Sequence, residues 1–290
     1  MKIYLTEPVS NILLNYINSK HELVTDLNIC DIAISRNKVI GKNEIDNSKN
    51  LKLIAVHGTG YNMIDIDYAK KKNIAVFNTP NLNTNAVAEL NIMLMLMLAR
   101  NYEATKKTRI LGDIAVIGSE IENKTIGFIG VGNIASRTAK LLQAFNVELI
   151  GYNRTKKDSI IKLVSLDELL SKSEYIFITI ALNNETKEMI NEKLFNKMKK
   201  CPYLINSSRG GLINNDDLYN ALKNNKIKGY ASDVYNPEPI NLNNPLLKEN
   251  VIILPHVGAN TKEALDKMSL AIIDGIEAFL NNNEIKNRLV

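Results

Sequence analysis

Short apolar runs alternate with segments of helical periodicity along the chain. Continuous apolar runs are typical of strands buried on both faces, whereas apolar positions three and four residues apart are typical of amphipathic helices. Their repeated alternation predicts an α/β protein with parallel sheets. Strands are expected in an early set at 1–6, 22–26, 31–35, 51–56 and 74–78 and in a later set at 125–129, 147–152, 175–181, 203–206, 229–234 and 251–254.

The later set of strands has the size of a complete doubly wound dinucleotide-binding domain, so the early set is expected to form a separate domain. Helices are expected between the strands at 10–17, 65–72, 83–106 and 261–281. We therefore predict two Rossmann-like doubly wound domains around a cleft, the first of them flavodoxin-like. The predicted boundaries are 1–86 plus 263–290 for the substrate domain and 87–262 for the dinucleotide-binding domain.

A glycine-rich turn follows the strand expected at 125–129 and opens a helical segment at Asn133. Gly130 permits a tight turn, Gly132 lets a pyrophosphate approach the backbone, and Ala135 is small enough for close helix–strand contact. The helix N-terminus offers free N–H groups and a partial positive charge to the phosphates. The order strand, glycine turn, helix, strand favours a dinucleotide site over a plain βαβ turn.

The residues after the second strand of this unit bear on the choice of cofactor. An acidic side chain is expected there when the ribose hydroxyls of NAD are bound. Asn153 stands in that place, followed by Arg154, Lys156 and Lys157. A guanidinium can bind a 2′-phosphate bidentately, and a neutral amide does not repel one. The sequence therefore modestly favours NADPH, with NAD bound through Asn153 as the alternative.

Three polar residues follow apolar runs at the strand ends where doubly wound sheets bind ligands. They are Arg209, Glu238 and His256. A histidine can donate a proton to a ketone, a neighbouring carboxylate can orient it, and a guanidinium can bind a substrate carboxylate. Each alone is more consistent with an ordinary loop or turn residue than with a functional one. Together, beside a dinucleotide site, they favour hydride transfer to a 2-keto acid.

A second glycine-containing turn follows the strand expected at 51–56 in the first domain. Its residues Gly58, Thr59 and Gly60 present backbone N–H groups that suit a small anion, such as the carboxylate of the substrate. His57 immediately precedes this turn. For His57 a packing role is favoured over catalysis.

Composition narrows the function classes. The chain of 290 residues is 45% hydrophobic and 23% charged, as expected for globular domains. Its two cysteines cannot form a disulfide framework, and no signal peptide or membrane-length apolar run is visible, which favours a cytoplasmic protein. The net charge of +5 comes from scattered lysines rather than a basic block. No nucleic acid, membrane or metal partner is therefore expected.

Over essentially its whole length the chain resembles the D-isomer-specific 2-hydroxyacid dehydrogenases. The order and spacing of the matching motifs are specific to that family. These motifs are 57–65, 74–81 continuing into 86–89, 127–135, 205–211, 233–239 and 255–259.

The resemblance implies the D-stereochemistry and a role for each matching residue. It implies that Arg209 binds the substrate carboxylate, that His256 is the acid/base and that Glu238 is its partner. It also implies a homodimer formed through the helix at 83–106. The cofactor contacts that it implies are Thr59, Asn133, Ile134, Asn153, Ile180, Ser207, Ser208 and Asp233.

The segment 57–89 is most similar to the phosphoglycerate dehydrogenase branch, although no regulatory C-terminal domain is visible. Arg36 and Lys38 are therefore candidates to meet a substrate phosphate, with ordinary surface cations as an equally weighted alternative. Two departures from the family pattern affect the cofactor site. Asn153 replaces the usual acid, and Ala181 stands where proline is common.

The leading hypothesis is an NAD(P)-dependent D-2-hydroxyacid dehydrogenase acting on a small 2-keto acid of the phosphohydroxypyruvate, hydroxypyruvate or glyoxylate type. Two alternatives stay open: a phosphite-oxidising relative and a dinucleotide-sensing corepressor, which is a binding module. A formate dehydrogenase is disfavoured, because formate oxidation needs no proton acceptor and those relatives carry glutamine at the position of Glu238.

Overall fold

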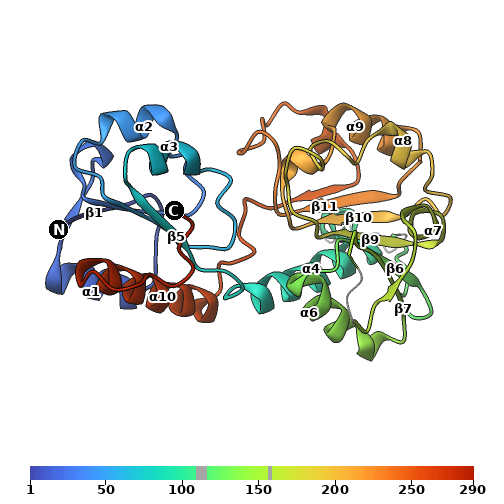
Figure 1. Ribbon diagram of the computed structural model, residues 1–290. Helices are drawn as coiled ribbons and strands as arrows, with labels where there is room; N and C mark the ends of the chain where they lie inside the picture. The colour runs from blue at the N-terminus through green and yellow to red at the C-terminus, as the bar shows by residue number, and fades with distance from the viewer. Residues whose placement is uncertain (109–115, 156–158) are drawn as a thin grey trace. The chain divides into compact units, whose positions relative to one another are not determined.

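The computed structural model describes residues 1–108, 116–155 and 159–290. The chain divides into two compact units, which are described here one at a time (Figure 1). The first unit comprises Met1–Asn83 and Ala259–Val290, and the second comprises Thr84–Gly258. No helix in the described part of the chain is long and apolar enough to cross a membrane.

The first unit contains a five-stranded parallel sheet with the order β2-β1-β3-β4-β5. This is the flavodoxin-like order, as predicted. Helices α1 and α10 cover one face and α2 and α3 the other (Figure 1), and each layer encloses its own apolar core. The elements are β1 (Lys2–Leu5), α1 (Asn11–Lys20), β2 (Glu22–Val24), β3 (Ile32–Ser35), α2 (Lys42–Asn47), β4 (Leu53–Val56), α3 (Ile66–Lys71), β5 (Ala75–Asn78) and α10 (Lys262–Leu280), with a 3-10 turn at Leu27–Ile29.

The second unit contains a seven-stranded parallel sheet with the order β12-β11-β10-β9-β6-β7-β8. Counted from β6, this is the Rossmann order 3-2-1-4-5-6 with one strand added, which confirms the predicted doubly wound domain. The elements are α4 (Thr84–Ala99), α5 (Tyr102–Thr108), β6 (Thr125–Ile129), α6 (Asn133–Leu142), β7 (Glu148–Tyr152), β8 (Lys162–Leu163), α7 (Leu166–Lys172), β9 (Tyr175–Ile178), α8 (Glu192–Phe195), β10 (Tyr203–Asn206), α9 (Asn215–Lys223), β11 (Gly229–Ser232) and β12 (Val251–Ile253), with 3-10 turns at Gln143–Phe145, Gly210–Leu212 and Pro245–Lys248.

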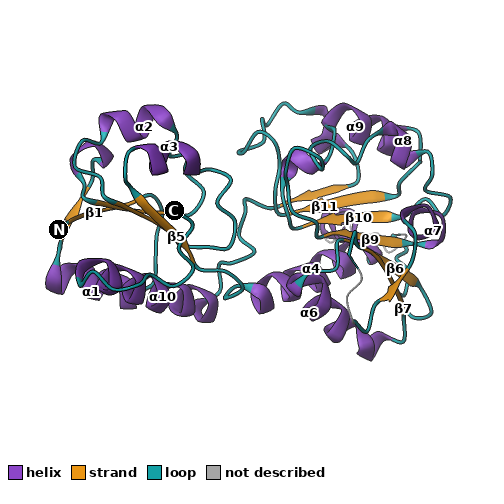
Figure 2. Cartoon of the chain, in the orientation of Figure 1, coloured by secondary structure: helices purple, strands orange, loops and turns teal. Residues whose placement is uncertain are grey.

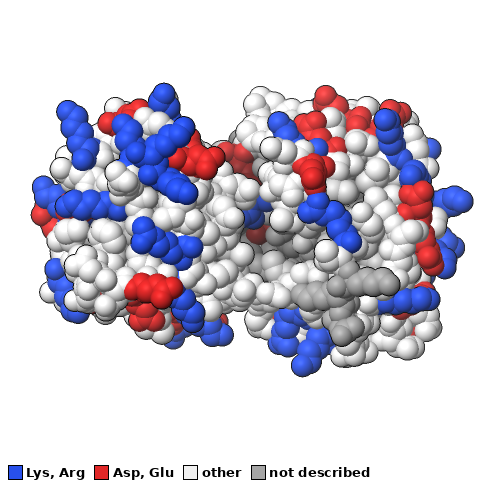
Figure 3. Space-filling view, in the orientation of Figure 1, with Lys and Arg blue, Asp and Glu red and all other residues white. Residues whose placement is uncertain are grey.

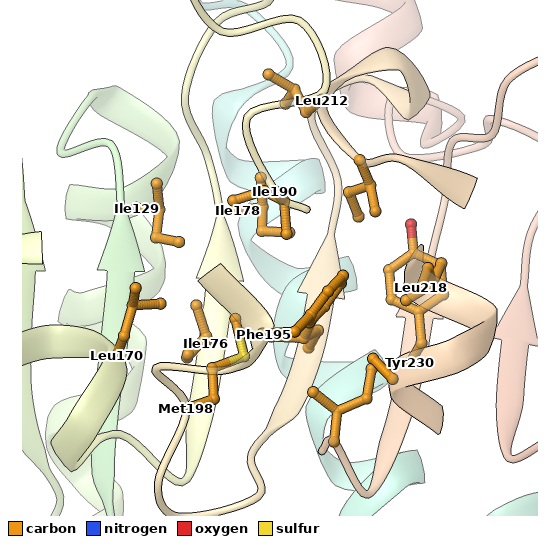
Figure 4. Close-up of a cluster of buried hydrophobic side chains, with 14 of the residues drawn as sticks. Ile129, Leu170, Ile176, Ile178, Ile190, Phe195, Met198, Leu212, Leu218 and Tyr230 are labelled. Atoms are coloured by element: carbon orange, nitrogen blue, oxygen red, sulfur yellow. The ribbon is translucent and has the colours of Figure 1, made fainter. Parts of the chain in front are cut away.

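Two apolar layers hold this larger sheet in place. Helices α4 and α6 pack on one face (Figure 2), where Leu94 and Ala139 are fully buried. Figure 4 shows the other face, where Leu170, Phe195 and Leu218 from α7, α8 and α9 surround the strand side chains. Because the strands are buried on both faces, polar groups can approach them only at their ends. On the visible surface of each unit, cationic and anionic side chains are interspersed (Figure 3).

None of the expected helix ranges covers α2, α7, α8 or α9. Two further differences from the expected elements have a local cause. The single helix expected at 83–106 is divided into α4 and α5, because Asn101 adopts a left-handed conformation with φ 47°. Asparagine tolerates that conformation better than most residues, and α5 buries none of its residues to oppose the break. Strand β8 was not predicted. It has only two residues, neither of them buried, so it produces no apolar run.

Candidate active site

Arg209, Glu238 and His256 lie in the loops that follow three adjacent strands of the second unit. Arg209 follows β10, Glu238 follows β11 and His256 follows β12. The strands pair in parallel, so their carboxyl ends share one edge of the sheet. Sheet order thus gathers three residues that are well separated in the sequence.

Glu238 and His256 form a hydrogen-bonded pair. Their Oε2 and Nδ1 atoms are 2.9 Å apart, and Glu238 Oε1 accepts the Tyr235 backbone N–H at 2.8 Å. Burial by itself would raise the pKa of Glu238. The bonds from His256 and Tyr235 and the charges of His256 and Arg209 outweigh it and hold the pKa below its usual value. Glu238 is therefore a carboxylate at neutral pH, and it leaves His256 Nε2 available for a substrate.

Arg209 is half-buried and held by its own loop. Its Nη1 donates to the Ser208 carbonyl at 2.7 Å. Burial lowers the pKa of the guanidinium and the charge of Glu238 opposes that effect, so the group stays protonated at neutral pH. The buried Asn206 fixes the loop, because its Nδ2 donates to the Arg209 carbonyl at 3.1 Å and its Oδ1 accepts from Ser208 N at 3.0 Å. The sequence analysis did not single out Asn206, although its place at the end of β10 marked it.

The backbone of His256 adopts a left-handed conformation, with φ 57°. Asp233 holds this turn from the end of β11: its Oδ1 accepts from Val257 N and its Oδ2 from Gly258 N, each at 2.7 Å. Burial raises the pKa of Asp233, and the two amides oppose that shift. Asp233 was expected to contact the cofactor. Both of its oxygens bond the turn that carries the histidine, and its contact with the cofactor stays a prediction.

The glycine turn after β6 fits a dinucleotide. Gly130 has φ 98°, and a Cβ there would lie 2.7 Å from the Ile180 backbone, so the position requires glycine. A Cβ on Gly132 would meet nothing within 4 Å, which leaves open space beside the N-terminus of α6. The N-cap residue of that ten-residue helix is Gly132, which makes no side-chain cap bond. The first backbone amides of this helix, at Asn133 and Ile134, are donors of the kind that a pyrophosphate needs.

The loops beside this turn are joined through several of the predicted cofactor residues. Ser208 Oγ donates to the Ile180 carbonyl at 2.5 Å, and Thr179 Oγ1 donates to the Gly130 carbonyl at 2.6 Å. The strand expected to run to residue 181 ends at Ile178, so Ile180 lies in the loop. Ser207 lies half-buried beside Ser208 at the end of β10.

The residues after β7 have partners within the protein. Asn153 Oδ1 accepts from Val131 N at 3.4 Å, and its Nδ2 donates to the Thr155 carbonyl at 2.8 Å. Arg154 forms an ion pair with Glu185. Lys156 and Lys157, which supported the NADPH preference, lie outside the described residues.

In the first unit, His57 is buried and its Nε2 lies 3.0 Å from Ser269 Oγ on α10. The turn that follows is tied back to the end of β5. Asn78 Nδ2 donates to the Thr59 carbonyl at 2.7 Å, and Thr79 N donates to the Gly58 carbonyl at 3.0 Å. The sequence analysis did not single out Asn78. Substrate binding by Gly58, Thr59 and Gly60, and the cofactor contact of Thr59, stay predictions.

The candidate phosphate-binding cations also have partners. Arg36 Nη2 donates to Asn260 Oδ1, and Lys38 Nζ donates to Tyr4 Oη at 2.8 Å. The backbone amides of Arg36 and Lys38 both donate to the Glu7 carboxylate, at 3.0 and 3.1 Å. These cations therefore have structural partners, and their proposed contact with a substrate phosphate stays a prediction.

A Rossmann sheet with an unobstructed glycine turn and a histidine–carboxylate pair at its ligand edge defines a dinucleotide-dependent oxidoreductase. Comparison with known proteins supports this class of enzyme. Residues 92–258 match the family model described as "D-isomer specific 2-hydroxyacid dehydrogenase, NAD binding domain". A protein named as a 2-hydroxyacid dehydrogenase in Staphylococcus epidermidis is 39% identical over 256 residues, which cover 84% of this chain and 81% of that protein.

Solved structures agree with this match over the full chain. The NAD-dependent formate dehydrogenase from Staphylococcus aureus, in complex with NAD, has a TM-score of 0.89 at 29% identity, covering 100% of this chain and 99% of that one. An acyclic imino acid reductase, in complex with NADPH and D-Arg, has a TM-score of 0.87 at 30% identity, covering 100% of both chains. The chain belongs to the D-isomer-specific 2-hydroxyacid dehydrogenase family, and its cofactor is NAD or NADP.

Proposed function

We propose that the protein interconverts a small 2-keto acid and its D-2-hydroxy acid. The observation that carries this proposal is the 2.9 Å contact between His256 and Glu238, beside the half-buried Arg209. A carbonyl reduction requires a hydride, a proton and a binding group for the substrate carboxylate. The bound nicotinamide supplies or accepts the hydride, and residues of the chain provide the other two functions.

His256 moves the proton. In reduction, its Nε2–H donates to the carbonyl oxygen of the substrate, which becomes the hydroxyl of the product. In oxidation, the neutral Nε2 accepts that hydroxyl proton. Glu238 accepts the Nδ1–H in both states, which fixes the tautomer and stabilises the imidazolium.

Arg209 binds the carboxylate of the substrate in this proposal. A guanidinium suits this role because two parallel N–H groups fix the plane of a carboxylate and so orient the adjacent carbonyl. We expect Arg209→Lys to raise the KM of the keto acid by about 10- to 100-fold, because a lysine ammonium is a point charge without the paired donors of the guanidinium. Dinucleotide affinity should change little.

The experiment that tests the function measures initial rates of NADH and NADPH oxidation with phosphohydroxypyruvate, hydroxypyruvate and glyoxylate in parallel. Preference for the phosphorylated acid would support the phosphate role of Arg36 or Lys38. Preference for the other two would assign a hydroxypyruvate or glyoxylate reductase. Tight dinucleotide binding without turnover of any of them would contradict the proposed activity and favour a sensor.

Formate and phosphite are the informative control substrates. Formate loses only a hydride when it becomes carbon dioxide, so it does not require the His256–Glu238 pair. Equal formate oxidation by the wild type and by His256→Asn, without keto acid reduction, would place the protein with its formate-oxidising structural neighbour rather than with the proposed activity. Phosphite oxidation in place of keto acid reduction would also contradict it.

We also propose that the protein forms a homodimer through the region 83–106. Met93 on α4 is 42% exposed, and Tyr102 at the start of α5 is 44% exposed. Such large apolar side chains are the kind that a second copy covers. Light scattering of the wild type and of Met93→Glu tests this. A monomeric wild type would contradict the proposal.

A further inference from the structure

An ion pair connects two loops beside the glycine turn. Arg154, after β7, pairs with Glu185, in the turn after β9. Strands β7 and β9 are the two neighbours of β6, whose end carries the glycine turn. The pair therefore joins the two strand ends that flank the dinucleotide turn. Its side chains are 62% and 73% exposed, so an incoming ligand can reach both of them.

The position of Glu185 is set by a fixed turn. Asn183 Oδ1 accepts from Glu185 N at 2.9 Å and from Thr186 N at 3.0 Å. The buried Thr186 completes the turn by donating from Oγ1 to the Ala181 carbonyl at 2.7 Å. The backbone that carries Glu185 is thus anchored to the loop after β9. Only the side-chain torsions of Arg154 and Glu185 need to change for the pair to separate.

Arg154 is the described cation that is placed to bind a 2′-phosphate, because it directly follows the residue that meets the adenosine ribose in this fold. Asn153 is neutral, and its amide already bonds Val131 and Thr155. A phosphate and the Glu185 carboxylate therefore compete for one guanidinium. NAD has no phosphate at that position and leaves the pair intact.

We propose that Glu185 is a specificity-determining residue for the cofactor, which lowers the preference for NADP over NAD by occupying Arg154. The inference rests on the dinucleotide-dependent activity described above. Glu185 lies in the loop after β9, away from the strand end where cofactor choice is usually sought. A substitution of Glu185 should change the discrimination between the two cofactors without any change at Asn153 or Arg154.

The test is a double-mutant cycle on binding, measured without substrate. Dissociation constants for NADPH and NADH are determined by fluorescence titration at one ionic strength for the wild type, Glu185→Gln, Arg154→Gln and the double variant. An exposed ion pair contributes about 1 kcal/mol or less, so we expect Glu185→Gln to tighten NADPH binding by about two- to fivefold. The dissociation constant of NADH should change by less than about twofold, because NADH has no 2′-phosphate to bind Arg154. In the Arg154→Gln background the same substitution should have no effect on the ratio.

Glu188→Gln is the matched control. Glu188 lies near the same turn, is exposed and forms no ion pair with another described residue. Its replacement by glutamine therefore removes the same charge without releasing Arg154. An unchanged ratio in Glu185→Gln would overturn the inference. So would an equal shift in Glu188→Gln, or a shift that persists without Arg154. Failure of the dinucleotides to bind the wild type at all would instead contradict the proposed function.

Discussion

Asp233→Asn should separate the placement of His256 from cofactor binding. The carboxylate of Asp233 accepts two backbone N–H groups at 2.7 Å each, from the residues that follow His256. An amide keeps one acceptor and turns its NH₂ group toward the other N–H. The lost hydrogen bond to a charged acceptor contributed about 1.5–3 kcal/mol. A left-handed residue costs about 1–2 kcal/mol, so the remaining bond no longer clearly outweighs the strain at His256.

We therefore expect the productive orientation of His256 to become a minor state in Asp233→Asn. If the whole free energy of the lost hydrogen bond reduces the population of the productive orientation, kcat falls by about 10- to 100-fold. The dissociation constants for NADH and NADPH should stay within about threefold, because the glycine turn and α6 are untouched. The assay combines steady-state kinetics with fluorescence titration of each dinucleotide.

Asp217→Asn is the control for this substitution. Asp217 lies on α9, and its carboxylate accepts from Glu192 N at 2.9 Å, so the same kind of bond is weakened away from His256. Its kcat should be unchanged. A kcat in Asp233→Asn within threefold of the wild type would refute the reasoning. A loss of dinucleotide affinity as large as the loss of kcat would instead assign Asp233 to cofactor binding.

Four further substitutions test other residues of the protein. His256→Asn should lower kcat by at least about 100-fold while dinucleotide affinity is kept, and loss of both together would contradict an acid/base role. Gly132→Ala should leave the melting temperature unchanged and weaken the binding of both dinucleotides, because a Cβ there meets no protein atom. Gly130→Ala should lower the melting temperature, because a Cβ there meets the backbone of Ile180. Equal melting temperatures of the two variants would count against this distinction. Burial, the largest cause, lowers the pKa of His57 from 6.5 to about 4. The folded state therefore favours neutral His57, and this contribution to stability is fully present above pH 6.5. About 3 kcal/mol of the free energy of unfolding should be lost as the pH falls from 6.5 toward 4. Urea unfolding across this range should show a shallower pH dependence in His57→Gln than in the wild type, and parallel curves would disprove the assignment.

The sequence by itself determined the strands, the glycine turn and the class of chemistry. A strand buried on both faces must be largely apolar, so runs such as 125–129 and 203–206 appear directly in the sequence and match β6 and β10. Gly130 and Gly132 were recognisable because a tight turn and a phosphate approach each exclude a side chain. Where the local pattern was weak, as at β8 and at Asn101, the sequence analysis missed the element or its break.

Only the tertiary structure decided which side chains meet. Glu238 reaches His256 and Asp233 reaches the turn after His256 because β11 and β12 are neighbours in the sheet. Glu185 reaches Arg154 because β9 and β7 flank β6. Local periodicity carries no information about that order. The supporting role of Asn78 stayed hidden for the same reason, since it bonds a backbone carbonyl in a separate loop. A buried strand is specified by its own residues, whereas a site is specified by the contacts between loops that the fold brings together.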